Sequence, residues 1–359
     1  MTPRVHVLGL GSIGTFVAHS LAEIPQRPAV TLLLHRPSLM DSYLRKDKKI
    51  LLKTIQGEVI ANGSYGFEVL RDNEWYTTDP DLWSSPSRQL GSRDARTGSM
   101  IEHLIVCVKA TQTVDALHPL LSRLGRQSTI MFLQNGAGMI EDVNDCLFRD
   151  PYTRPNYMTG VISHGVTLNN SFDITHTGFA ATSIGAVPRG EDSVLTDRSE
   201  GLAPLAHYLL QALPQVPRLN CRSFEWLEVF QLQLEKLSTN AFCNPLCALA
   251  DSPNKYLFTI PEMCRALISE ISSVVLALPE LHGVDGVRER FSSKSLEETV
   301  MSIIDRTRET TCSMVWDLRA GRETEVRYIN GYWVRRGREL GIPTPLNEEL
   351  VQKIQSRTG

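Results

Sequence analysis

A glycine-rich hexapeptide near the N-terminus constrains the fold of this chain more than any other stretch. Gly9-Leu10-Gly11-Ser12-Ile13-Gly14 follows a short β-prone run, Arg4–Leu8, and precedes Thr15–Ile24, in which apolar residues recur at helical spacing. In this position the first glycine allows a tight turn, the second lets a pyrophosphate approach the backbone, and the third permits close helix–strand packing. The pattern predicts a Rossmann-type dinucleotide-binding domain, and the alternative is a glycine-rich turn without a ligand.

The residues after the second predicted strand indicate which dinucleotide is bound. Ala29–Leu34 ends in His35-Arg36-Pro37-Ser38, where NAD-selective folds usually carry an acidic residue for the ribose 2′-hydroxyl. A guanidinium at this point suits a 2′-phosphate instead, and Ser38 can add a hydroxyl group. The sequence therefore favours NADPH over NADH, unless Arg36 is simply a surface residue at a strand end.

Two further buried strands are predicted at His103–Val108 and Thr129–Leu133, each followed by a polar residue. Ligands bind beyond the carboxyl ends of the strands in an open parallel sheet, so Lys109 and Asn135 are both expected to face the cofactor. For each residue taken alone a turn-forming role is equally open, since Asn before Gly is common in turns.

Further β-strands are predicted between residues 157 and 187. Residues 157–167 and 174–187 alternate β-prone residues with glycines, which predicts closing strands of the same sheet. Residues 218–223 are expected to form a linker.

From Phe224 onward only helical patterns occur, and Ser295-Leu296-Glu297-Glu298 resembles a capping box that opens one of the helices. The order of elements predicts an NADP-binding Rossmann-like domain over residues 1–221 and a helical substrate and catalytic domain over 222–359. Small-molecule sites prefer the cleft between such domains.

One predicted helix in the second half, Phe224–Leu249, carries a polar row on one side and apolar residues on another. Lys236, Asn240 and Asn244 are spaced at i, i+4 and i+8, so one ammonium and two amides lie along one face. That face can donate several hydrogen bonds to one small oxygen-rich molecule, and the alternative is a solvated polar face. Pro245 is expected to bend or loosen the helix just after the second amide.

Composition narrows the function classes. With 359 residues the chain exceeds what one hydrophobic core usually supports, and its net charge of −3 provides no attraction to nucleic acid or anionic membrane. The seven cysteines have no zinc-ligand spacing, which favours free thiols in a reducing compartment and no metal site. No apolar run reaches the ~18 residues of a membrane helix. A strand beginning near Arg4 leaves no room for an N-terminal targeting peptide, so we expect a cytoplasmic protein.

Five segments together resemble the ketopantoate reductase (2-dehydropantoate 2-reductase) family. They are GLGSIG at 9–14, VKATQT at 108–113, QNGAG at 134–138, KLSTNAFCNPL at 236–246 and SMVWDLRAGRETEVRYINGYW at 313–333. The resemblance spans nearly the whole chain, and the last two segments are far more specific than the glycine loop. The length and the polar stretches Trp83–Met100 and Arg189–Arg198 are more similar to fungal members than to the compact bacterial ones.

This resemblance implies a Rossmann-type α/β domain followed by an all-α domain, in a 6-phosphogluconate dehydrogenase-like fold. It also implies the NADPH-dependent reduction of 2-dehydropantoate to (R)-pantoate in pantothenate and coenzyme A biosynthesis. Lys236 would donate a proton to the ketone oxygen, and Glu325 would lie beside it and the nicotinamide ribose. Asn135 would lie between nicotinamide and substrate. The other substrate contacts would come from Asn240, Asn244, Asn254 and Ser313. The cofactor contacts would come from Gly9, Leu10, Gly11, Ser12, Ile13, Gly14, Arg36, Lys109, Asn135, Glu325 and the backbone near Val166.

The residue types agree with this chemistry. Hydride delivery to a C2 ketone builds negative charge on the oxygen, and a cation that can also release a proton stabilises it. Burial should lower the pKa of Lys236, whereas Glu325 would oppose that shift through its charge, and the sequence leaves open which effect dominates.

Two alternatives remain beside the reductase of ketopantoate: an NADPH-dependent reductase of another branched 2-oxo acid or an imine, and a non-catalytic reductase-like binding protein. The expected partner is a small 2-oxo acid, with neither nucleic acid nor membrane, and a homodimer formed through the helical domain is a possible assembly.

Overall fold

The computed structural model describes residues 3–83, 95–189 and 204–357. Most of the two polar stretches, Trp83–Met100 and Arg189–Arg198, lies outside the described residues.

The chain divides into two compact units. The first comprises residues 1–134 and 140–229, and the second comprises residues 135–139 and 230–359. The loop 135–139 therefore belongs with the C-terminal unit, although its neighbours in sequence belong to the first.

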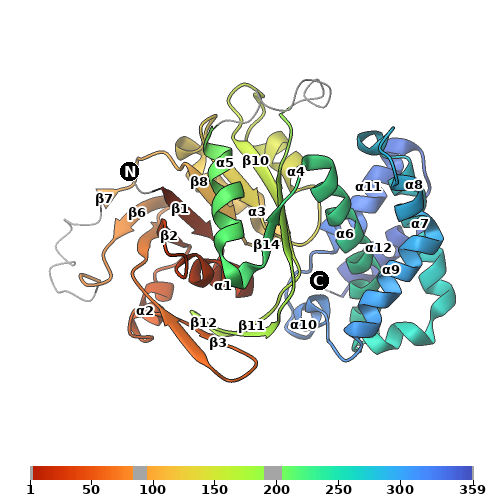
Figure 1. The fold of residues 1–359 in the computed structure, drawn as a ribbon, viewed down its shortest axis with the longest axis horizontal. Coiled ribbons are helices and arrows are strands. Elements are labelled where there is room, and N and C mark those ends of the chain that lie inside the picture. Colours follow the sequence, from red (N-terminus) through yellow and green to blue (C-terminus); the bar gives the residue numbers. More distant parts are fainter. Residues whose placement is uncertain (1–2, 84–94, 190–203, 358–359) are drawn as a thin grey trace. The chain divides into compact units, whose positions relative to one another are not determined.

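A ten-stranded sheet forms the centre of the first unit (Figure 1). Its order is β14-β13-β10-β9-β8-β1-β2-β5-β6-β7, and the six strands from β10 to β5 run parallel. From β1 the chain adds β2 on one side and later β8 on the other, so the order reverses between β1 and β8, where sheets of this type bind ligands. The strands are β1 (Arg4–Leu8), β2 (Ala29–Leu34), β5 (Gly66–Arg71), β6 (Glu74–Thr78), β7 (Ala95–Arg96), β8 (His103–Val106), β9 (Thr129–Phe132), β10 (Asn156–Ile162), β13 (Thr182–Ala186) and β14 (Cys221–Ser223).

A second sheet of four strands lies on the other side of helix α1 (Ser12–Leu21), which contacts both sheets (Figure 1). Its order is β11-β12-β3-β4, with β12 paired in parallel to β3 through Asp173 and Leu51. The prediction that residues 157–167 and 174–187 close the main sheet is therefore wrong for the parts that lie in β11 and β12. The strands are β3 (Ile50–Lys53), β4 (Val59–Asn62), β11 (Gly165–Asn170) and β12 (Asp173–Gly178).

The core of this unit forms where α1 packs between the sheets. Phe16, Val17 and Leu21 of α1 are fully buried, in one cluster with Val7 of β1 and Ile174 of β12. A buried apolar side chain of this size contributes about 1.5–3 kcal/mol, so α1 is firmly held at the end of β1. The remaining helices of the unit are α2 (Ser38–Leu44), η2 (Ala110–Gln112), α3 (Thr113–Leu117), η3 (His118–Arg123), α4 (Met139–Cys146), α5 (Pro204–Ala212), η5 (Leu213–Gln215) and η6 (Pro217–Leu219).

The predicted linker over residues 218–223 is wrong. Leu219 is buried, and residues 221–223 form β14, which pairs in parallel with β13 at the edge of the main sheet. A strand of three residues, two of them polar, has no periodicity that could have revealed it.

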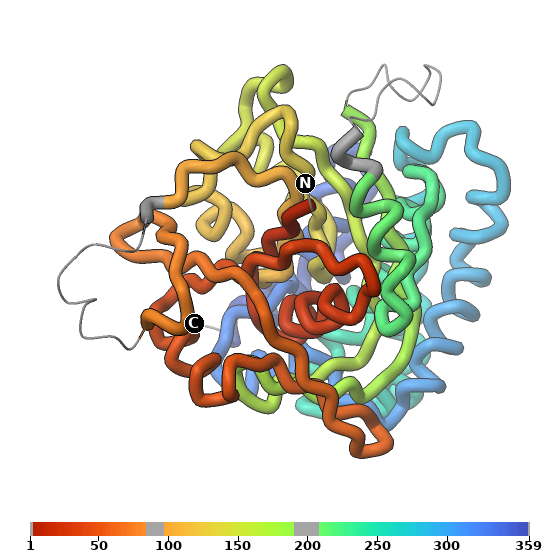
Figure 2. Tube along the Cα trace, turned by 60° about the vertical axis from the view of Figure 1, so that its left-hand side comes forward, coloured from red at the N-terminus to blue at the C-terminus, as the bar shows by residue number. Residues whose placement is uncertain are grey.

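Within residues 230–357 the regular secondary structure is helical, and this part is drawn from green-cyan to blue in Figure 2. The helices begin with α6, whose first residues belong to the first unit. The helices are α6 (Trp226–Leu249), η7 (Asn254–Thr259), α7 (Pro261–Leu276), η8 (Pro279–Leu281), α8 (Val287–Phe291), α9 (Ser293–Arg306), α10 (Ser313–Arg319), η9 (Val326–Tyr328), α11 (Asn330–Leu340) and α12 (Pro345–Gln355).

The predicted capping box at Ser295 is wrong. Helix α9 begins at Ser293, and the Ser292 hydroxyl accepts a hydrogen bond from the backbone N–H of Ser295 at 3.3 Å. Ser292 is thus the N-cap, since a cap side chain accepts from the second or third helical N–H.

Helix α6 runs unbroken through Pro245. Proline has no N–H, so the carbonyl of Ala241, four residues earlier, lacks its helical partner. That carbonyl accepts a hydrogen bond of 2.9 Å from the Nδ2 of Asn330, at the start of α11, which also donates to the Oδ1 of Asn347 at 3.0 Å. The Asn330 side chain, from another helix, thus replaces the missing backbone donor. Both asparagines are fully buried.

Candidate active site

The three glycines of the hexapeptide fill the three positions of the dinucleotide fingerprint. Gly9 has a φ of 94°, and a Cβ there would lie 2.4 Å from the backbone nitrogen of Val108. A Cβ on Gly14 would lie 1.8 Å from the carbonyl oxygen of Gly9. Gly11, the N-cap of α1, is exposed, and a Cβ there would meet nothing within 4 Å. The loop thus combines two tightly packed glycines with an open approach to the first turn of α1. The other three loop residues, Leu10, Ser12 and Ile13, are partly buried.

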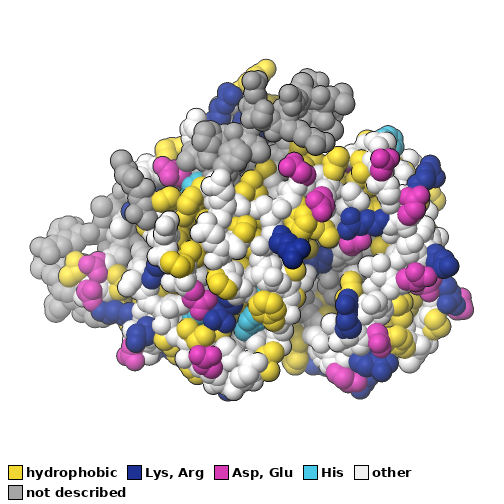
Figure 3. Space-filling view, viewed as in Figure 1, with side chains coloured by type: hydrophobic (Ala, Val, Ile, Leu, Met, Phe, Trp, Pro, Cys, Tyr) yellow, Lys and Arg dark blue, Asp and Glu magenta, His cyan; other side chains and the backbone are white. Residues whose placement is uncertain are grey.

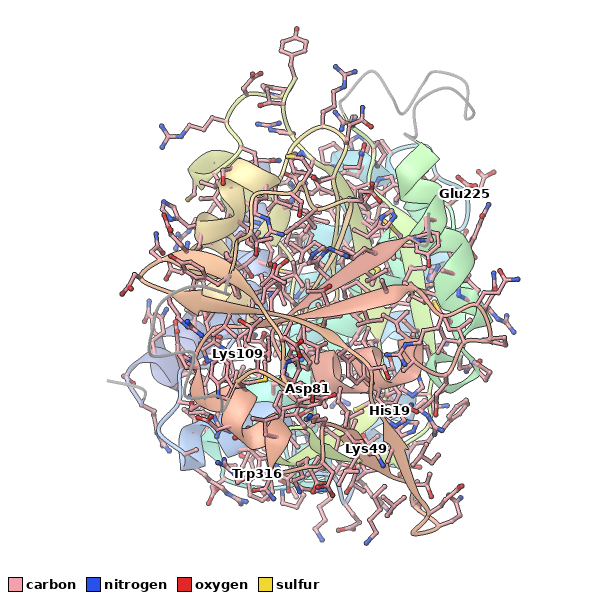
Figure 4. The ribbon with its side chains drawn as sticks, turned by 90° about the vertical axis from the view of Figure 1, so that its left-hand side faces the viewer. His19, Lys49, Asp81, Lys109, Glu225 and Trp316 are labelled. Atoms are coloured by element: carbon pink, nitrogen blue, oxygen red, sulfur yellow. The ribbon has the colours of Figure 1, made fainter. Side chains whose placement is uncertain are left out.

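Two of the predicted cofactor residues lie at the same edge of the main sheet as this loop. Arg36 is exposed just beyond the end of β2. Lys109, labelled in Figure 4, is partly buried just beyond β8. Since β1, β2 and β8 are parallel neighbours, their carboxyl ends meet at this edge. Val166 lies instead in β11 of the smaller sheet, packed against the core of the unit.

Asn135 belongs to the loop 135–139 and lies in the helical unit. The backbone N–H of Ala137 donates to the carbonyl of Tyr328 at 2.9 Å, and the side chain of Gln233 donates to the carbonyl of Gly136 at 3.3 Å. Gly136 has a φ of 92°, and a Cβ there would lie 2.6 Å from the carbonyl oxygen of Tyr328. These contacts fix the loop on the helices.

Lys236 and Asn135 are in direct contact. The Nζ of Lys236 donates a hydrogen bond of 3.0 Å to the Oδ1 of Asn135. Burial lowers the pKa of Lys236 to about 8, while the negative charge of Glu325 acts in the opposite direction. Of the two effects that the sequence left undecided, burial is the larger. The site thus holds an ammonium group able to release its proton near neutral pH.

Asn240 and Asn244 continue the row from Lys236 along α6. Asn240 is partly buried and Asn244 is 6% exposed. Within the described part of the chain neither side-chain amide makes a hydrogen bond, whereas most buried polar groups in proteins have a partner. Both amides therefore remain available to a small molecule.

Asn254 and Ser313 differ in this respect. The Asn254 amide is buried and used within the protein, since its Oδ1 accepts from the Cys243 thiol at 3.0 Å and its Nδ2 donates to Thr307 at 3.1 Å. Ser313 is exposed at the start of α10. The preceding residue, Cys312, donates to the carbonyl of Asn244 at 3.7 Å, so the start of α10 lies beside the second amide of the row.

Sequence reasoning missed two residues that support this arrangement. Gln233 lies one helical turn before Lys236, so extending the polar row towards the N-terminus could have identified it. Tyr328 contributes through its backbone carbonyl, for which the sequence contains no signal.

The described residues contain no group of three or more His, Cys, Asp or Glu side chains suited to hold a metal ion. Over residues 3–83, 95–189 and 204–357, no helix has both the length and the apolarity needed to cross a lipid bilayer. On the surface visible in Figure 3, acidic and basic side chains are interspersed.

Two family models together match most of the chain. The model described as ketopantoate reductase PanE/ApbA matches residues 5–189, and the one described as the C-terminal part of the same family matches residues 228–358. The chain therefore belongs to the ketopantoate reductase PanE/ApbA family, and the resemblance seen in the sequence is confirmed.

Relatives with assigned names agree with this family. The probable 2-dehydropantoate 2-reductase of the fungus Schizosaccharomyces pombe is 29% identical over 100% of this chain and 97% of its own length. The 2-dehydropantoate 2-reductase of Yersinia pestis is 31% identical over 76% and 79%. A ketoisovalerate reductase of Gibberella fujikuroi is 26% identical over 94% and 79%.

Solved structures share the fold. The probable 2-dehydropantoate 2-reductase of Bacillus subtilis aligns with a TM-score of 0.66 at 22% identity, covering 99% of both chains. D-mandelate dehydrogenase in complex with NADH and anilino(oxo)acetate aligns with a TM-score of 0.70 at 15% identity, covering 99% of this chain and 98% of that one. The predicted combination of a Rossmann-type domain and a helical domain is confirmed.

Proposed function

We propose that this protein is an NADPH-dependent 2-dehydropantoate 2-reductase, which reduces the C2 ketone of 2-dehydropantoate to (R)-pantoate in pantothenate and coenzyme A biosynthesis. Family membership and the names of the relatives support this activity. The observation that carries it is a lysine of lowered pKa, hydrogen bonded to Asn135 and followed on one helix face by two amides with no protein partner among the described residues.

Lys236 is the proposed general acid. Reduction of a ketone places negative charge on its oxygen, which a nearby ammonium stabilises and then protonates. With a pKa of about 8 the amine is mostly protonated at neutral pH, yet it releases a proton more readily than an ordinary lysine. The charge of Glu325 prevents the pKa of Lys236 from falling further. The Oδ1 of Asn135 accepts a hydrogen bond from the ammonium group and so orients it.

The amides of Asn240 and Asn244 and the hydroxyl of Ser313 are the proposed contacts for the carboxylate and hydroxyl groups of the substrate. Asn254 is included in this set, although it would contact substrate only by exchanging its present bonds to Cys243 or Thr307. A site that hydrogen bonds a substrate hydroxyl discriminates strongly against an analogue that lacks it.

The glycine loop fits a dinucleotide, because Gly11 leaves open space before the first turn of α1 where a pyrophosphate binds. When bound, NADPH supplies the hydride for the reaction. Residues 9–14 would hold its pyrophosphate, Arg36 its 2′-phosphate and Lys109 a further phosphate or ribose oxygen. The backbone near Val166, together with Asn135 and Glu325, would contact the nicotinamide end.

The test is the oxidation of NADPH in the presence of 2-dehydropantoate, followed by absorbance. Lys236→Ala should lower kcat by about 10²–10⁴-fold, the usual contribution of a general acid. Calorimetry should show unchanged binding of NADPH. Lys255→Ala is the matched control, since this exposed lysine pairs with Glu309 at the surface, and it should retain full activity. Near-normal turnover by Lys236→Ala would refute the proposed role.

The same assay with a panel of 2-oxo acids tests the substrate. Preference for 2-dehydropantoate over 2-oxoisovalerate, which lacks the hydroxymethyl group, supports the proposal. Preference for another acid contradicts it, and no oxidation with any acid would indicate a protein without this activity.

The proposal includes a cytoplasmic location and a homodimer formed through the helical domain. Light scattering coupled to size-exclusion chromatography measures the second, and a monomer at micromolar concentration contradicts it.

A further inference from the structure

Three cysteines of the helical unit form a cluster beside the proposed substrate residues. Cys243 and Cys247 lie on α6, and Cys312 is the N-cap of α10. The thiols of Cys243 and Cys247 lie 3.0 and 3.9 Å from the same acceptor, the Oδ1 of Asn254. The titration of the Cys243 thiol is also coupled electrostatically to those of Cys247 and Cys312.

Of the two pairs that Cys243 can form, the one with Cys247 does not suit a disulfide. Cys243 and Cys247 are separated by one turn of the same helix, where Cβ atoms are about 5–6 Å apart, whereas a disulfide needs about 3.5–4.5 Å. Cys312 comes from a different element, and its thiol reaches the backbone carbonyl of Asn244, the residue after Cys243. Cys312 and Cys243 therefore both lie at the contact between the start of α10 and α6.

The two thiols also differ in reactivity. Cys312 is partly exposed, whereas Cys243 is 4% exposed. Hydrogen bonding from the Cys243 thiol and from the backbone N–H groups of Val315 and Met314 holds the pKa of Cys312 below its ordinary value. Hydrogen bonds to Cys247 and Cys312 and burial raise the pKa of Cys243. Cys312 is thus the more accessible and the more acidic of the two thiols, whereas Cys243 favours the protonated form, an arrangement found in redox-sensing cysteine pairs.

We propose that Cys312 and Cys243 form a reversible disulfide on exposure to a hydroperoxide, and that this bond reduces substrate binding. The Cys312 thiolate attacks hydrogen peroxide, forming a sulfenic acid and hydroxide. The sulfur of Cys243 then attacks the sulfenic sulfur, its proton leaves with the sulfenic oxygen, and water is released. Overall two thiols are oxidised to one disulfide and one peroxide is reduced to two waters.

The expected loss of substrate affinity follows from the residues next to the two cysteines in sequence, and this step rests on the proposed function. Cys243 immediately precedes Asn244, and Cys312 immediately precedes Ser313. Pulling the two sulfurs to a covalent distance moves the backbone on which both proposed substrate contacts depend. Losing one hydrogen bond to substrate corresponds to about a tenfold rise in KM. The predicted cofactor residues before residue 134 lie on other elements, so NADPH affinity should not change.

The bond itself can be detected without an activity assay. The full-length reduced protein is treated with hydrogen peroxide, blocked with N-ethylmaleimide and digested with trypsin. Cleavage after Lys236 and Lys255 releases residues 237–255, and cleavage after Arg308 and Arg319 releases residues 309–319. We expect these two peptides as one cross-linked species that dithiothreitol separates.

Variants identify the pair, because residues 237–255 contain both Cys243 and Cys247. The cross-link should be lost in Cys243→Ser and Cys312→Ser, and should persist in Cys247→Ser and in Cys146→Ser, which removes an exposed thiol of the other unit. Peroxide should raise the KM of the wild type about tenfold, reversibly, and leave Cys312→Ser unaffected. Absence of the cross-linked peptide in the wild type, or its persistence in Cys243→Ser, overturns the proposed disulfide. A cross-link that leaves KM unchanged overturns its effect on substrate, and a cross-link in a protein inactive on every 2-oxo acid refutes only the proposed function.

Discussion

Asn330 should be essential for stability because Pro245 lies inside α6. Replacing Asn330 by Ala leaves two buried acceptors without a donor, the carbonyl of Ala241 and the Oδ1 of Asn347. An orphaned buried acceptor costs about 1–3 kcal/mol, so the substitution should lower the free energy of unfolding of the helical unit by about 3 kcal/mol.

Asn330→Ala should lower the free energy of unfolding by less when residue 245 has a backbone N–H. In a Pro245→Ala background the new backbone N–H can donate to the carbonyl of Ala241 as in an ordinary helix, so only the Oδ1 of Asn347 remains without a donor. The cost of Asn330→Ala should then fall by about 1–2 kcal/mol, giving a favourable coupling energy of that size in a double-mutant cycle.

Urea denaturation followed by the helical circular dichroism signal measures all four proteins of this cycle. Gln352→Ala, at an exposed position of α12 in the same unit, is the control and should stay within about 0.5 kcal/mol of wild type. If the effects of Asn330→Ala and Pro245→Ala simply add, Asn330 does not substitute for the missing helical donor, and the reasoning fails.

Three further predictions concern the site. Because the general acid must be protonated, kcat should be constant below about pH 8 and fall above it. Glu325→Gln removes a charge that raises the pKa of Lys236, so this fall should move to lower pH. An unchanged pH–rate profile in the variant would contradict that role of Glu325. Arg36→Ala should raise the KM for NADPH about 10–100-fold, the value of a charged hydrogen bond to phosphate, with little effect on NADH; equal effects on both would refute 2′-phosphate recognition. Gly14→Ala should lower the melting temperature sharply, since its Cβ would overlap the Gly9 carbonyl. Gly11→Ala should have the melting temperature of the wild type but bind NADPH more weakly. Thermal scans measure the first effect and calorimetry the second.

The features that the sequence predicted correctly are those encoded locally. The glycine fingerprint, the buried parallel strands and the long helix of Lys236 each have a periodicity or a motif within a few residues. The pairing of strands is different, because β12 joins β3 through a register that links residue 173 to residue 51. No local pattern records that partner, and both the separate sheet and the short edge strand β14 were therefore missed.

The candidate site shows the same limit. The helical spacing from Lys236 to Asn244 and the position of Asn135 after a strand follow from the sequence. The family resemblance added Asn254, Ser313 and Glu325. The partner of each group does not follow, because it depends on tertiary contacts. Asn254 illustrates this, since its amide is bonded to Cys243 on α6 and to Thr307, which is 53 residues away in sequence.

The membership of the loop 135–139 in the helical unit matters for protein engineering. A chimera that joins the Rossmann-type half of one family member to the helical half of another, with a single crossover near residue 229, would inherit the lysine from one parent and its amide partner from the other. The contacts of Ala137 with Tyr328 and of Gly136 with Gln233 would then be made between mismatched sequences. A recombination scheme that transfers the helical half intact must therefore exchange this internal loop as well.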